Sequence, residues 1–392
     1  MRIAVSGMGI VSSLGIGVEA NMVAIGREES GIVSGSRFLP VSLTVPVGEV
    51  PFSNEELALR AGVGEYCVYS RTALLGILAV QEALADSGEG KGLRTGLVSG
   101  TSVGGMDRTE IFYADYLADP ERGRLREVAM HDCAASTLAI VRHCGIEGYT
   151  TTVSTACSSA ANAVLTAARL IRCGIADRMV AGGTDALSLF TLGGFGSLMI
   201  LDKQPCRPFD ADRAGLNLGE GAGYIVLQRE DTLQKEPYAY LAGGANANDA
   251  YHQTASSASG EGCYKAMSDT LRKAGVAADK IDYVNAHGTG TPNNDLSESR
   301  ALCRLFANKV PPFSSTKGFT GHTLAAAGGM EAVFSVQALH RGVICPNLNF
   351  SRPIEETGLI PVTERRDAPL HYVLSNSLGF GGNCTSLLFS KD

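Results

Sequence analysis

The sequence predicts an α/β protein with two core-forming halves, and three observations favour this fold class. The chain has 392 residues, whereas a single domain usually has about 100–200. Short β-branched runs alternate with longer helical patterns along the whole chain, which is typical of layered strands and helices. Glycine accounts for 47 residues and hydrophobic residues for 45% of the chain, so many tight turns and a large core are both expected.

Strands are predicted at the β-branched runs, and most of them are expected to be parallel. The clearest runs cover residues 94–101, 178–184, 281–286 and 372–377. Apolar periodicity and length predict helices at residues 70–87, 158–172 and 323–340. The last two are rich in alanine and poor in charge, so we expect them to be buried in the middle of the molecule.

The two halves are expected to be fused through one interface, because no Pro/Ser-rich linker or low-complexity segment separates them. The junction is predicted near residues 231–237, which divides the chain into residues 1–236 and 237–392. Each half contains one alanine-rich helix that follows small polar residues and precedes a strand. This coarse similarity indicates an internal repeat.

Charge and composition exclude several classes of protein. The formal net charge is −7, so no overall basic field attracts nucleic acid. The ten cysteines are scattered without a CxxC pair, which argues against a zinc or redox motif and indicates a reducing compartment. The longest uncharged stretch, residues 148–168, contains many Thr, Ser and Asn, so we expect no membrane span and a cytoplasmic protein.

Cys157 is the candidate nucleophile. It lies in Thr155-Ala156-Cys157-Ser158-Ser159, between a predicted strand and the first alanine-rich helix. A helix N-terminus has unpaired N–H groups and the positive end of the dipole, both of which favour a thiolate. We therefore expect Cys157 to be the most readily alkylated cysteine. The alternative interpretation is a small buried thiol in a tight turn.

Two histidines and a lysine lie at predicted element ends. His287 follows an apolar strand, where ligands bind in such sheets, although it could simply cap the strand. Lys317 and His322 both precede the second alanine-rich helix. Cations are disfavoured at a helix start, so a purely structural placement would be unusual. The alternative is a solvated lysine and a capping histidine.

Near the C-terminus, a glycine-rich loop surrounds Phe380. Its backbone could supply an N–H group to an oxyanion while the ring covers a pocket, or the loop could be an ordinary turn. Other familiar signatures fail, because Gly7-Met8-Gly9 lacks the third glycine of a dinucleotide fingerprint and neither GxxxxGK[ST] nor HExxH occurs. The histidines have no metal-binding spacing, and we expect neither a metal nor an organic cofactor.

Taken together and in this order, the motifs resemble the β-ketoacyl-acyl-carrier-protein synthases of the KAS II type. The matching segments are Thr155-Ala156-Cys157-Ser158-Ser159, Asn285-Ala286-His287-Gly288-Thr289, Lys317-Gly318-Phe319-Thr320-Gly321-His322 and Gly379-Phe380-Gly381-Gly382. The resemblance implies the thiolase fold, with two related halves in five layers, α/β/α/β/α. One central helix would carry Cys157 and the other would follow His322. The resemblance also implies a homodimer.

The activity that the resemblance implies is a two-step condensation in fatty acid elongation. Cys157 would accept an acyl chain from acyl-carrier protein, with the oxyanion held by the N–H groups of Cys157 and Phe380, the latter also acting as a gate. Malonyl-carrier protein would then lose carbon dioxide while His287 and His322 stabilise the enolate. The carbanion would attack the acyl chain to form a β-ketoacyl product.

Five further positions receive roles by the same resemblance. Lys317 would order the site electrostatically with Glu331 as an inner partner, and Thr289 and Thr291 would hold the pantetheine arm. Val103 would point into the far end of the acyl tunnel and limit chain length. The alternative for Val103 is packing at a strand end. Asn285, Glu331, Ser375 and Asn376 match positions that enclose a structural cation in some relatives, but no bound ion is expected here.

Several other functions stay open on the sequence. A ketosynthase of a polyketide or aryl polyene pathway would use the same residues on other substrates. An inactive chain-length-factor-type partner would keep the fold, but the retained Cys157, His287, His322 and Lys317 argue against it. A degradative thiolase would need a second cysteine, and Cys384 follows Gly-Gly-Asn instead of a thiolase-like motif. A Cys/His hydrolase would release the acyl chain as a free acid.

Overall fold

The computed structural model describes residues 1–39, 45–64, 68–307 and 309–392. The first half contains the strands β1 (Ile3–Ser12), β2 (Gly15–Ile16), β3 (Val33–Ser34), β4 (Pro46–Val47), β5 (Thr95–Gly100), β6 (Thr150–Val153), β7 (Arg178–Asp185) and β8 (Gly221–Arg229). Its helices are α1 (Val18–Gly26), α2 (Asn54–Ala61), α3 (Arg71–Ser87), α4 (Met106–Ala118), α5 (Leu125–Val128), α6 (Cys133–Cys144), α7 (Ser159–Arg172), α8 (Leu189–Ser197) and the 3₁₀ turn η1 (Glu230–Thr232).

The second half is built in the same alternating way. Its strands are β9 (Ala239–Asn248), β10 (Tyr283–Asn285), β11 (Phe313–Ser314), β12 (Val343–Ile344), β13 (Arg366–Asp367), β14 (Tyr372–Gly379) and β15 (Asn383–Ser390). Its helical elements are α9 (Glu261–Ala274), η2 (Ala278–Lys280), α10 (Pro292–Leu305), α11 (Lys317–Thr320), η3 (Leu324–Ala326), α12 (Ala327–Arg341) and η4 (Phe380–Gly382). The predicted strands and helices are confirmed, with ends that shift by a few residues.

The two halves repeat one strand order within a large sheet. The order is β11-β10-β14-β15-β9-β1-β8-β7-β5-β6, so β9, β15, β14, β10 and β11 follow the same sequence as β1, β8, β7, β5 and β6. The halves join where β1 pairs with β9 at Val5 and Ala239. The division of the chain after residue 236 stays a prediction, and it falls between η1 and β9.

The prediction of mainly parallel strands is wrong, because the last strand of each half runs antiparallel to both of its neighbours. β8 pairs in this way with β1 and β7, and β15 with β9 and β14. Among the strands that the structure describes, only β5, β6 and β7, and likewise β10, β11 and β14, pair in parallel. For β15 the physical reason is visible at η4, where three residues join it to β14, while a parallel connection needs a dozen or more.

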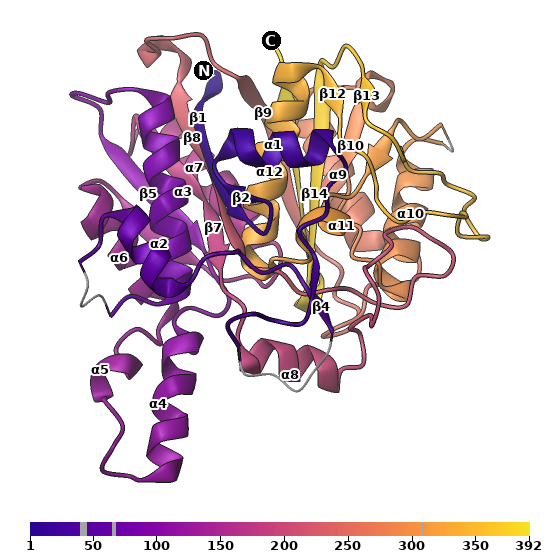
Figure 1. Cartoon of the computed structure of the whole chain (residues 1–392). Helices are drawn as coiled ribbons and strands as arrows, with labels where there is room; N and C mark the ends of the chain where they lie inside the picture. Colours follow the sequence, from indigo (N-terminus) through magenta and orange to yellow (C-terminus); the bar gives the residue numbers. More distant parts are fainter. Residues whose placement is uncertain (40–44, 65–67, 308) are drawn as a thin grey trace.

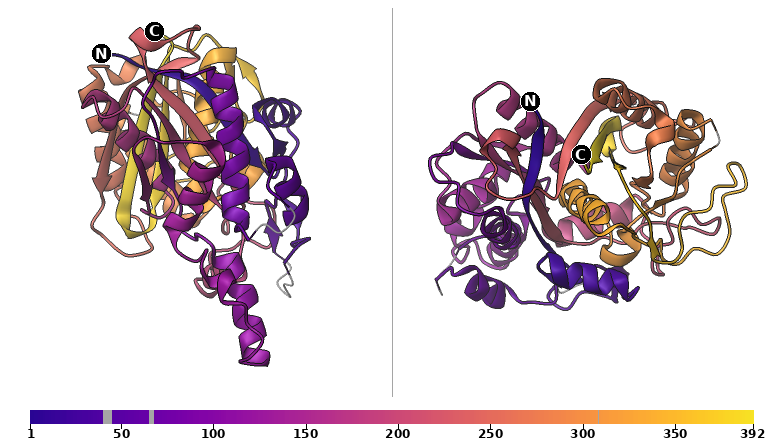
Figure 2. Two further views of the ribbon diagram at one scale, coloured as in Figure 1. Left: turned by 90° about the vertical axis from the view of Figure 1, so that its left-hand side faces the viewer. Right: turned by 90° about the horizontal axis from the view of Figure 1, so that it is seen from above.

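The layers follow from the helix contacts. α3 and α6 cover the outer face of the first half, and α9 and α10 cover the outer face of the second (Figures 1 and 2). The central helices α7 and α12 contact each other and strands of both halves. A Cβ atom on Gly223 of β8 would lie 2.4 Å from the backbone nitrogen of Met330 of α12, so only glycine allows this close approach. Both alanine-rich helices are therefore central, as predicted.

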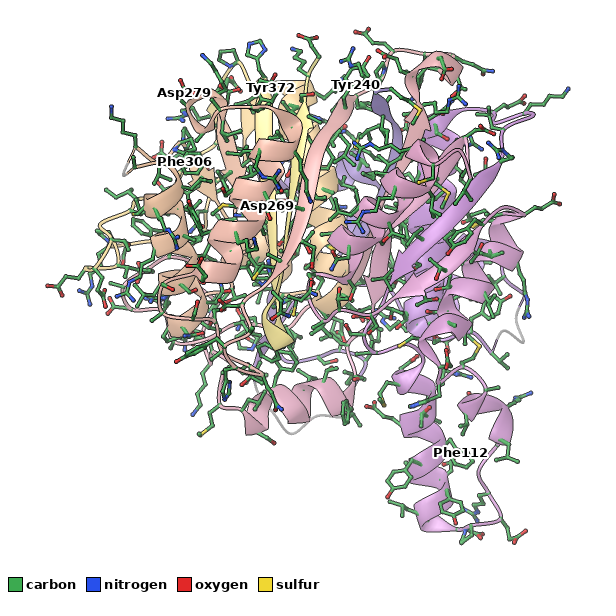
Figure 3. All side chains as sticks on the ribbon, turned by 180° about the vertical axis from the view of Figure 1, so that it is seen from behind. Phe112, Tyr240, Asp269, Asp279, Phe306 and Tyr372 are labelled. Carbon is green, nitrogen blue, oxygen red and sulfur yellow. The ribbon has the colours of Figure 1, made fainter. Side chains whose placement is uncertain are left out.

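One segment of the chain lies outside these layers. Helices α4 and α5 form an arm that projects beyond the layers, and Phe112 lies on it away from the sheet (Figures 1 and 3). No residue of α4 is buried. Within the described ranges, no helix is both long and apolar enough to cross a membrane.

Candidate active site

Cys157 lies in a tight turn between β6 and α7, and its exposed fraction is 6%. Ala156, just before it, has φ +52°, a left-handed conformation that is unusual for a residue with a side chain. Two hydroxyl groups hold the turn. Ser158 Oγ donates to the carbonyl of Thr155 at 2.8 Å, and Ser159 Oγ donates to the carbonyl of Ala156 at 2.6 Å. The sulfur is thus fixed in position at the start of the helix.

The electrostatics of Cys157 differ from the sequence expectation. Burial raises the pKa of its thiol to about 11, although the positive charge of Lys317 and hydrogen bonds from the backbone N–H groups of Phe380 and Cys157 itself oppose this rise. The nearby carboxylate of Asp185 raises the pKa further. Desolvation therefore outweighs the helix terminus in the resting protein. The backbone N–H groups of Cys157 and Phe380 therefore both lie near the sulfur.

The alkylation of Cys157 should depend steeply on pH. Its thiol has a pKa of about 11, so the thiolate fraction and the rate of labelling should rise about tenfold per pH unit between about pH 7 and 10. Cys173 is exposed and Cys157 is buried, so Cys173 should be labelled before Cys157 near neutral pH, contrary to the expectation that Cys157 is the most readily alkylated cysteine. Peptide mapping after timed iodoacetamide labelling would measure both rates. A Cys157 rate that levels off below about pH 9 would contradict this assignment.

His287 follows β10, and the backbone of its loop is held by two carboxylates of α10. Glu298 accepts hydrogen bonds from the N–H groups of His287 and Gly288, both at 2.9 Å. Asp295, one helical turn earlier, accepts from the N–H groups of Thr289 at 3.0 Å and Gly290 at 3.1 Å. The loop therefore has little freedom to move the imidazole.

Asp295 and Glu298 are residues that sequence reasoning missed. Their signal was present, because two acidic residues three positions apart in a helix lie on one face. The direction of that face depends on where α10 packs, which no local pattern reveals. Burial raises the pKa of Glu298 to about 7, in part opposed by the N–H groups that it accepts from.

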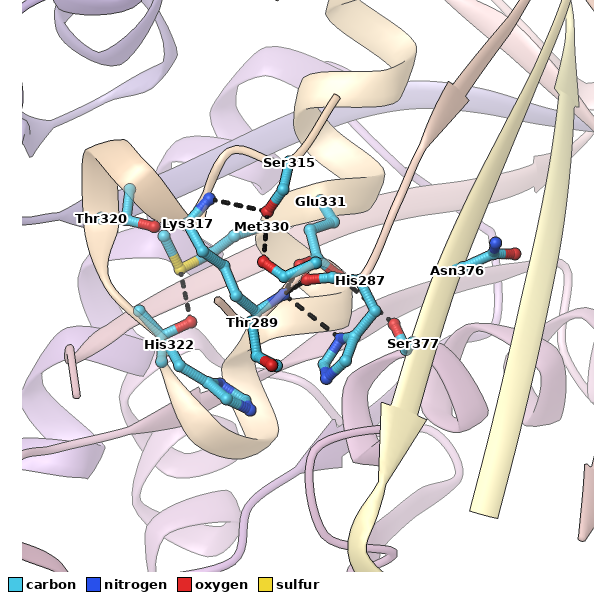
Figure 4. A network of polar contacts seen from close by, with 12 residues as sticks. His287, Thr289, Ser315, Lys317, Thr320, His322, Met330, Glu331, Asn376 and Ser377 are labelled. Carbon is cyan, nitrogen blue, oxygen red and sulfur yellow. Dashed lines mark hydrogen bonds and ion pairs between the residues drawn. The ribbon is translucent and has the colours of Figure 1, made fainter. Parts of the chain in front are cut away.

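Lys317 connects His287 to the helix α12 (Figure 4). Its Nζ lies 3.2 Å from Nδ1 of His287 and donates to the carbonyl of His287 at 2.5 Å. It also forms a buried ion pair with Glu331 of α12. A charged lysine can only donate, so Nδ1 of His287 accepts and the proton of the neutral ring lies on Nε2.

His322 reaches the same place from the loop between α11 and η3. Its Nδ1 accepts a hydrogen bond from the N–H of Leu324 at 3.2 Å, so its proton also lies on Nε2. The His322 and His287 rings meet edge to face with centroids 5.2 Å apart. Burial, followed by the positive charge of Lys317, holds the pKa of both histidines well below its usual 6.5. The site therefore contains two neighbouring neutral imidazoles, and the Nε2–H group of each is free to donate to a ligand.

These groups share one cavity of about 390 Å³. Of the predicted site residues, the cavity wall contains Cys157, His287, His322, Thr289, Thr291 and Phe380. The hydroxyl groups of Thr289 and Thr291 lie 2.9 Å apart on this wall. Lys317 and Glu331 lie behind His287 and do not line the cavity.

Val103 does not line this cavity either. It is buried in an apolar cluster with Leu216, which does line the cavity, and with Leu324, which follows the His322 turn. Its predicted effect on acyl-chain length stays a prediction. Packing at the end of β5, the alternative interpretation, describes its position in this structure.

Phe380 covers the cavity together with a second aromatic residue, Phe195 of α8. Their rings stack with centroids 5.7 Å apart and an angle of 13°. The backbone beyond Phe380 turns through Gly381 and Gly382, whose φ angles of +81° and +76° favour glycine. Sequence reasoning missed Phe195, because a single aromatic residue among glycines gives no pattern.

The positions that could enclose a cation hold one unusual group. Both polar side-chain atoms of Asn285 are buried and have no hydrogen-bond partner in the described part of the chain. Asn285 pairs with Ser375 of the neighbouring strand, and its amide oxygen is free to act as a ligand for a small cation at this end of the two strands. Among the residues that the structure describes, no group of three or more His, Cys, Asp or Glu could hold a metal ion.

Comparisons with known proteins agree with this geometry. The family model for the N-terminal domain of beta-ketoacyl synthase matches residues 1–232, and that for the C-terminal domain matches residues 238–351. The 3-oxoacyl-[acyl-carrier-protein] synthase 2 of Vibrio cholerae is 34% identical over 418 residues, which cover 100% of this chain and 99% of that protein.

Solved structures show the same relationship. The structure described as the ishigamide ketosynthase/chain length factor matches with a TM-score of 0.94 at 27% identity, covering 100% of this chain and 99% of that one. A chain from the complex of the ketosynthase ApeO with its chain length factor ApeC, from Xenorhabdus doucetiae, matches with a TM-score of 0.85 at 29% identity, covering 100% and 98%. By its sequence match over the full length and its layered architecture, this chain belongs to the β-ketoacyl synthase family and has the thiolase fold.

Proposed function

We propose that the chain is a 3-oxoacyl-[acyl-carrier-protein] synthase, an acyltransferase that condenses a Cys157-bound acyl chain with malonyl-carrier protein in fatty acid elongation. One observation carries the proposal. A buried cysteine with two N–H groups at its sulfur shares a cavity with two neutral imidazoles, His287 and His322. This arrangement suits two successive oxyanions, one on an acyl thioester and one on an enolate.

In the first step, the Cys157 sulfur attacks the thioester carbonyl of acyl-carrier protein as a thiolate, and the proton that its thiol gives up is the one that the released carrier sulfur finally takes. The oxyanion accepts hydrogen bonds from the N–H groups of Cys157 and Phe380. The carbon–sulfur bond to the carrier breaks, and the released carrier thiolate takes up a proton. The acyl chain then remains on Cys157, in the cavity that Phe380 and Phe195 line.

In the second step, the carbon–carbon bond to the malonyl carboxylate breaks and carbon dioxide leaves. The electron pair moves to the thioester oxygen, which accepts hydrogen bonds from Nε2–H of His287 and His322. Neutral donors stabilise this enolate without a fixed charge that would trap it. The enolate carbon attacks the acyl group, the bond to Cys157 breaks, and the released thiolate takes up a proton.

The remaining site residues support these steps. The Lys317–Glu331 ion pair holds Nδ1 of His287 as an acceptor and so keeps its proton on Nε2. The hydroxyl groups of Thr289 and Thr291 line the entrance wall, where they can hold a pantetheine arm. A cytoplasmic location stays a prediction from the sequence.

The test is mass spectrometry of the purified protein with acyl-carrier protein, with and without malonyl-carrier protein. The proposal expects an acylated Cys157 peptide without malonyl-carrier protein and a β-ketoacyl carrier product, longer by two carbons, with it. Release of free acid would identify a hydrolase instead. Cleavage of a β-ketoacyl thioester with no requirement for decarboxylation would identify a thiolase.

A second candidate is a ketosynthase of a polyketide or polyene pathway that works with a chain length factor. The observation that favours it is the likeness to two structures of ketosynthases described together with a chain length factor. The assay above separates the two candidates when it is run on this chain alone. Elongation of saturated primers without a second protein supports the fatty acid function, and elongation only with an added partner supports the second candidate.

We also propose that the chain forms a homodimer through the α4–α5 arm. Ile111, Tyr113 and Leu117 of α4 have exposed fractions of 50%, 57% and 64%, and Leu125 of α5 has 78%. Each such side chain would contribute about 1.5–3 kcal/mol if a second subunit buried it. A helix without a buried face has little reason to stay folded as a projection on its own.

Charge placed on this arm should convert the dimer to a monomer. In an Ile111→Asp/Leu117→Asp variant, two carboxylates would have to be desolvated at the interface, which costs several kcal/mol. Light scattering after size exclusion would measure the molar mass. The matched control is Leu59→Asp, because Leu59 of α2 is 78% exposed on the body of the molecule. A monomeric wild type, or an arm variant that stays dimeric, would contradict the proposal.

A further inference from the structure

Asp185 is a buried carboxylate at the C-terminal end of β7 that the steps above do not use. Its side chain is completely buried, and no Lys, Arg or His among the described residues forms an ion pair with it. An uncompensated charge in such a place is costly, and burial raises the pKa of Asp185 to about 6. The carboxylate is therefore ionised at neutral pH and needs hydrogen-bond donors.

The first set of donors comes from the end of β5, in the first half of the chain. Oδ1 of Asp185 accepts hydrogen bonds from Thr101 Oγ1 at 2.6 Å, from the N–H of Ser102 at 3.0 Å and from the N–H of Val103 at 3.2 Å. Thr101 Oγ1 in turn accepts from the N–H of Gly104 at 3.1 Å. Asp185 thus holds the loop that carries Val103.

The second donor comes from the other half of the chain. Oδ2 of Asp185 accepts a hydrogen bond from the N–H of Ala325 in η3 at 2.8 Å. The preceding residue, Leu324, has φ +52°, a strained conformation for leucine, and its N–H donates to Nδ1 of His322. The hydrogen bond to Ala325 therefore fixes the turn that sets the tautomer of His322.

The same charge acts on the nucleophile. Asp185 raises the pKa of Cys157, where Lys317 acts in the opposite direction. Its charge also raises the pKa values of Cys133 and Tyr224. Loss of this charge should therefore lower the pKa of Cys157.

Only a carboxylate satisfies all of these donors. An asparagine at position 185 would offer one oxygen, and its amide nitrogen would face an N–H or O–H donor in place of the other oxygen. A contact that only held the two halves together would not require the buried, charged carboxylate of Asp185. Apolar residues of similar size would fill the space with no cost of desolvation.

We propose that Asp185 is a positioning residue that couples the Val103 loop, predicted to lie at the far end of the acyl site, to the His322 turn at the decarboxylation site. The inference rests on the proposed function and names a residue that tunes both of its steps. Asp185 acts through Val103, Leu324 and Ala325 and does not itself contact the substrate.

An Asp185→Asn variant should change two readouts at once. Decarboxylation of malonyl-carrier protein should fall about tenfold in kcat with little change in KM, because the lost hydrogen bonds to a charged group orient His322. The preference among acyl primers of different length should become broader, because the Val103 loop is released. Both are measured with stably folded protein, whose melting temperature is recorded for each variant.

Two further variants make the coupling itself testable. Thr101→Val removes one donor in the first half, far in sequence from His322, and should still lower decarboxylation about twofold to threefold. Asp202→Asn is the matched control, because Asp202 is buried and its carboxylate caps the N–H of Gln204. The control should change neither readout. An unchanged decarboxylation rate in both folded Asp185→Asn and Thr101→Val overturns the proposal.

A readout without carrier protein separates this inference from the proposed function. In Asp185→Asn, the pH dependence of Cys157 alkylation should shift to lower pH than in the wild type, while that of Asp202→Asn should not. If the wild-type protein catalysed no condensation, the proposed function would be overturned, but the shift in the pH dependence of Cys157 alkylation could still be measured. A shift that is absent from the folded variant overturns the role of Asp185 whatever the activity of the wild type.

Discussion

A Cys157→Ala variant is expected to lose acyl transfer and condensation by about 10⁴-fold or more, the scale on which removal of a covalent nucleophile acts. Decarboxylation of malonyl-carrier protein should persist, because His287 and His322 stabilise the enolate without help from the sulfur. The variant separates the two steps because it removes only the group that carries the acyl chain.

Mass spectrometry of the intact protein with acyl-carrier protein would show whether an acyl adduct forms, and carbon dioxide release would follow decarboxylation. The matched control is Cys384→Ala, which removes a second buried cysteine near the loop of Phe380. It should condense at nearly the wild-type rate. If Cys384→Ala abolished condensation as well, a thiolase-like use of two cysteines would replace the present assignment.

Replacement of either histidine should have the opposite effect to Cys157→Ala: it should slow decarboxylation more than acyl transfer. His287→Ala or His322→Ala is expected to slow decarboxylation by about 10² or more, the usual effect of removing one oxyanion donor, while acylation of Cys157 suffers less. Because the pKa of each histidine lies well below 6.5, both rings stay neutral as the pH rises from about 6 to 8. The wild-type decarboxylation rate should therefore show no titration of either imidazole in that range.

The measurement is carbon dioxide release from malonyl-carrier protein as a function of pH, together with the rate of acyl-adduct formation. His371→Ala is the matched control, since His371 is exposed at the far end of β14. It should leave both rates unchanged. Near wild-type condensation in both active-site histidine variants would rule out the enolate site. A midpoint near pH 6.5 that is lost in either histidine variant would contradict the neutral state of that ring.

The sequence alone was sufficient for the elements and for the chemical groups. Helices α3, α7 and α12 and strands β5, β7 and β14 lie where periodicity and β-branched runs predicted them, because these signals arise from neighbouring residues. The motifs around Cys157, His287 and His322, taken in order, predicted the family. Each motif is a short run of residues that can be recognised without knowing how the chain folds.

The tertiary structure decided how the strands pair and what state each group is in. The last strand of each half runs antiparallel to both neighbours, and no pattern within one strand reports its neighbours. The resting thiol of Cys157 and the neutral rings of His287 and His322 follow from desolvation and from Lys317, which lies far from Cys157 in sequence.

Asp185 illustrates, in one residue, the difference between what the sequence predicts and what the tertiary structure decides. From the sequence it is a single aspartate at the end of an apolar strand. Only the packed protein brings the N–H groups of Ser102, Val103 and Ala325 to its two oxygens, from segments 82 to 140 positions away. Composition and spacing determine which chemical groups a chain possesses, whereas burial and long-range contacts determine their charge, because the desolvation of a group depends on everything that packs around it.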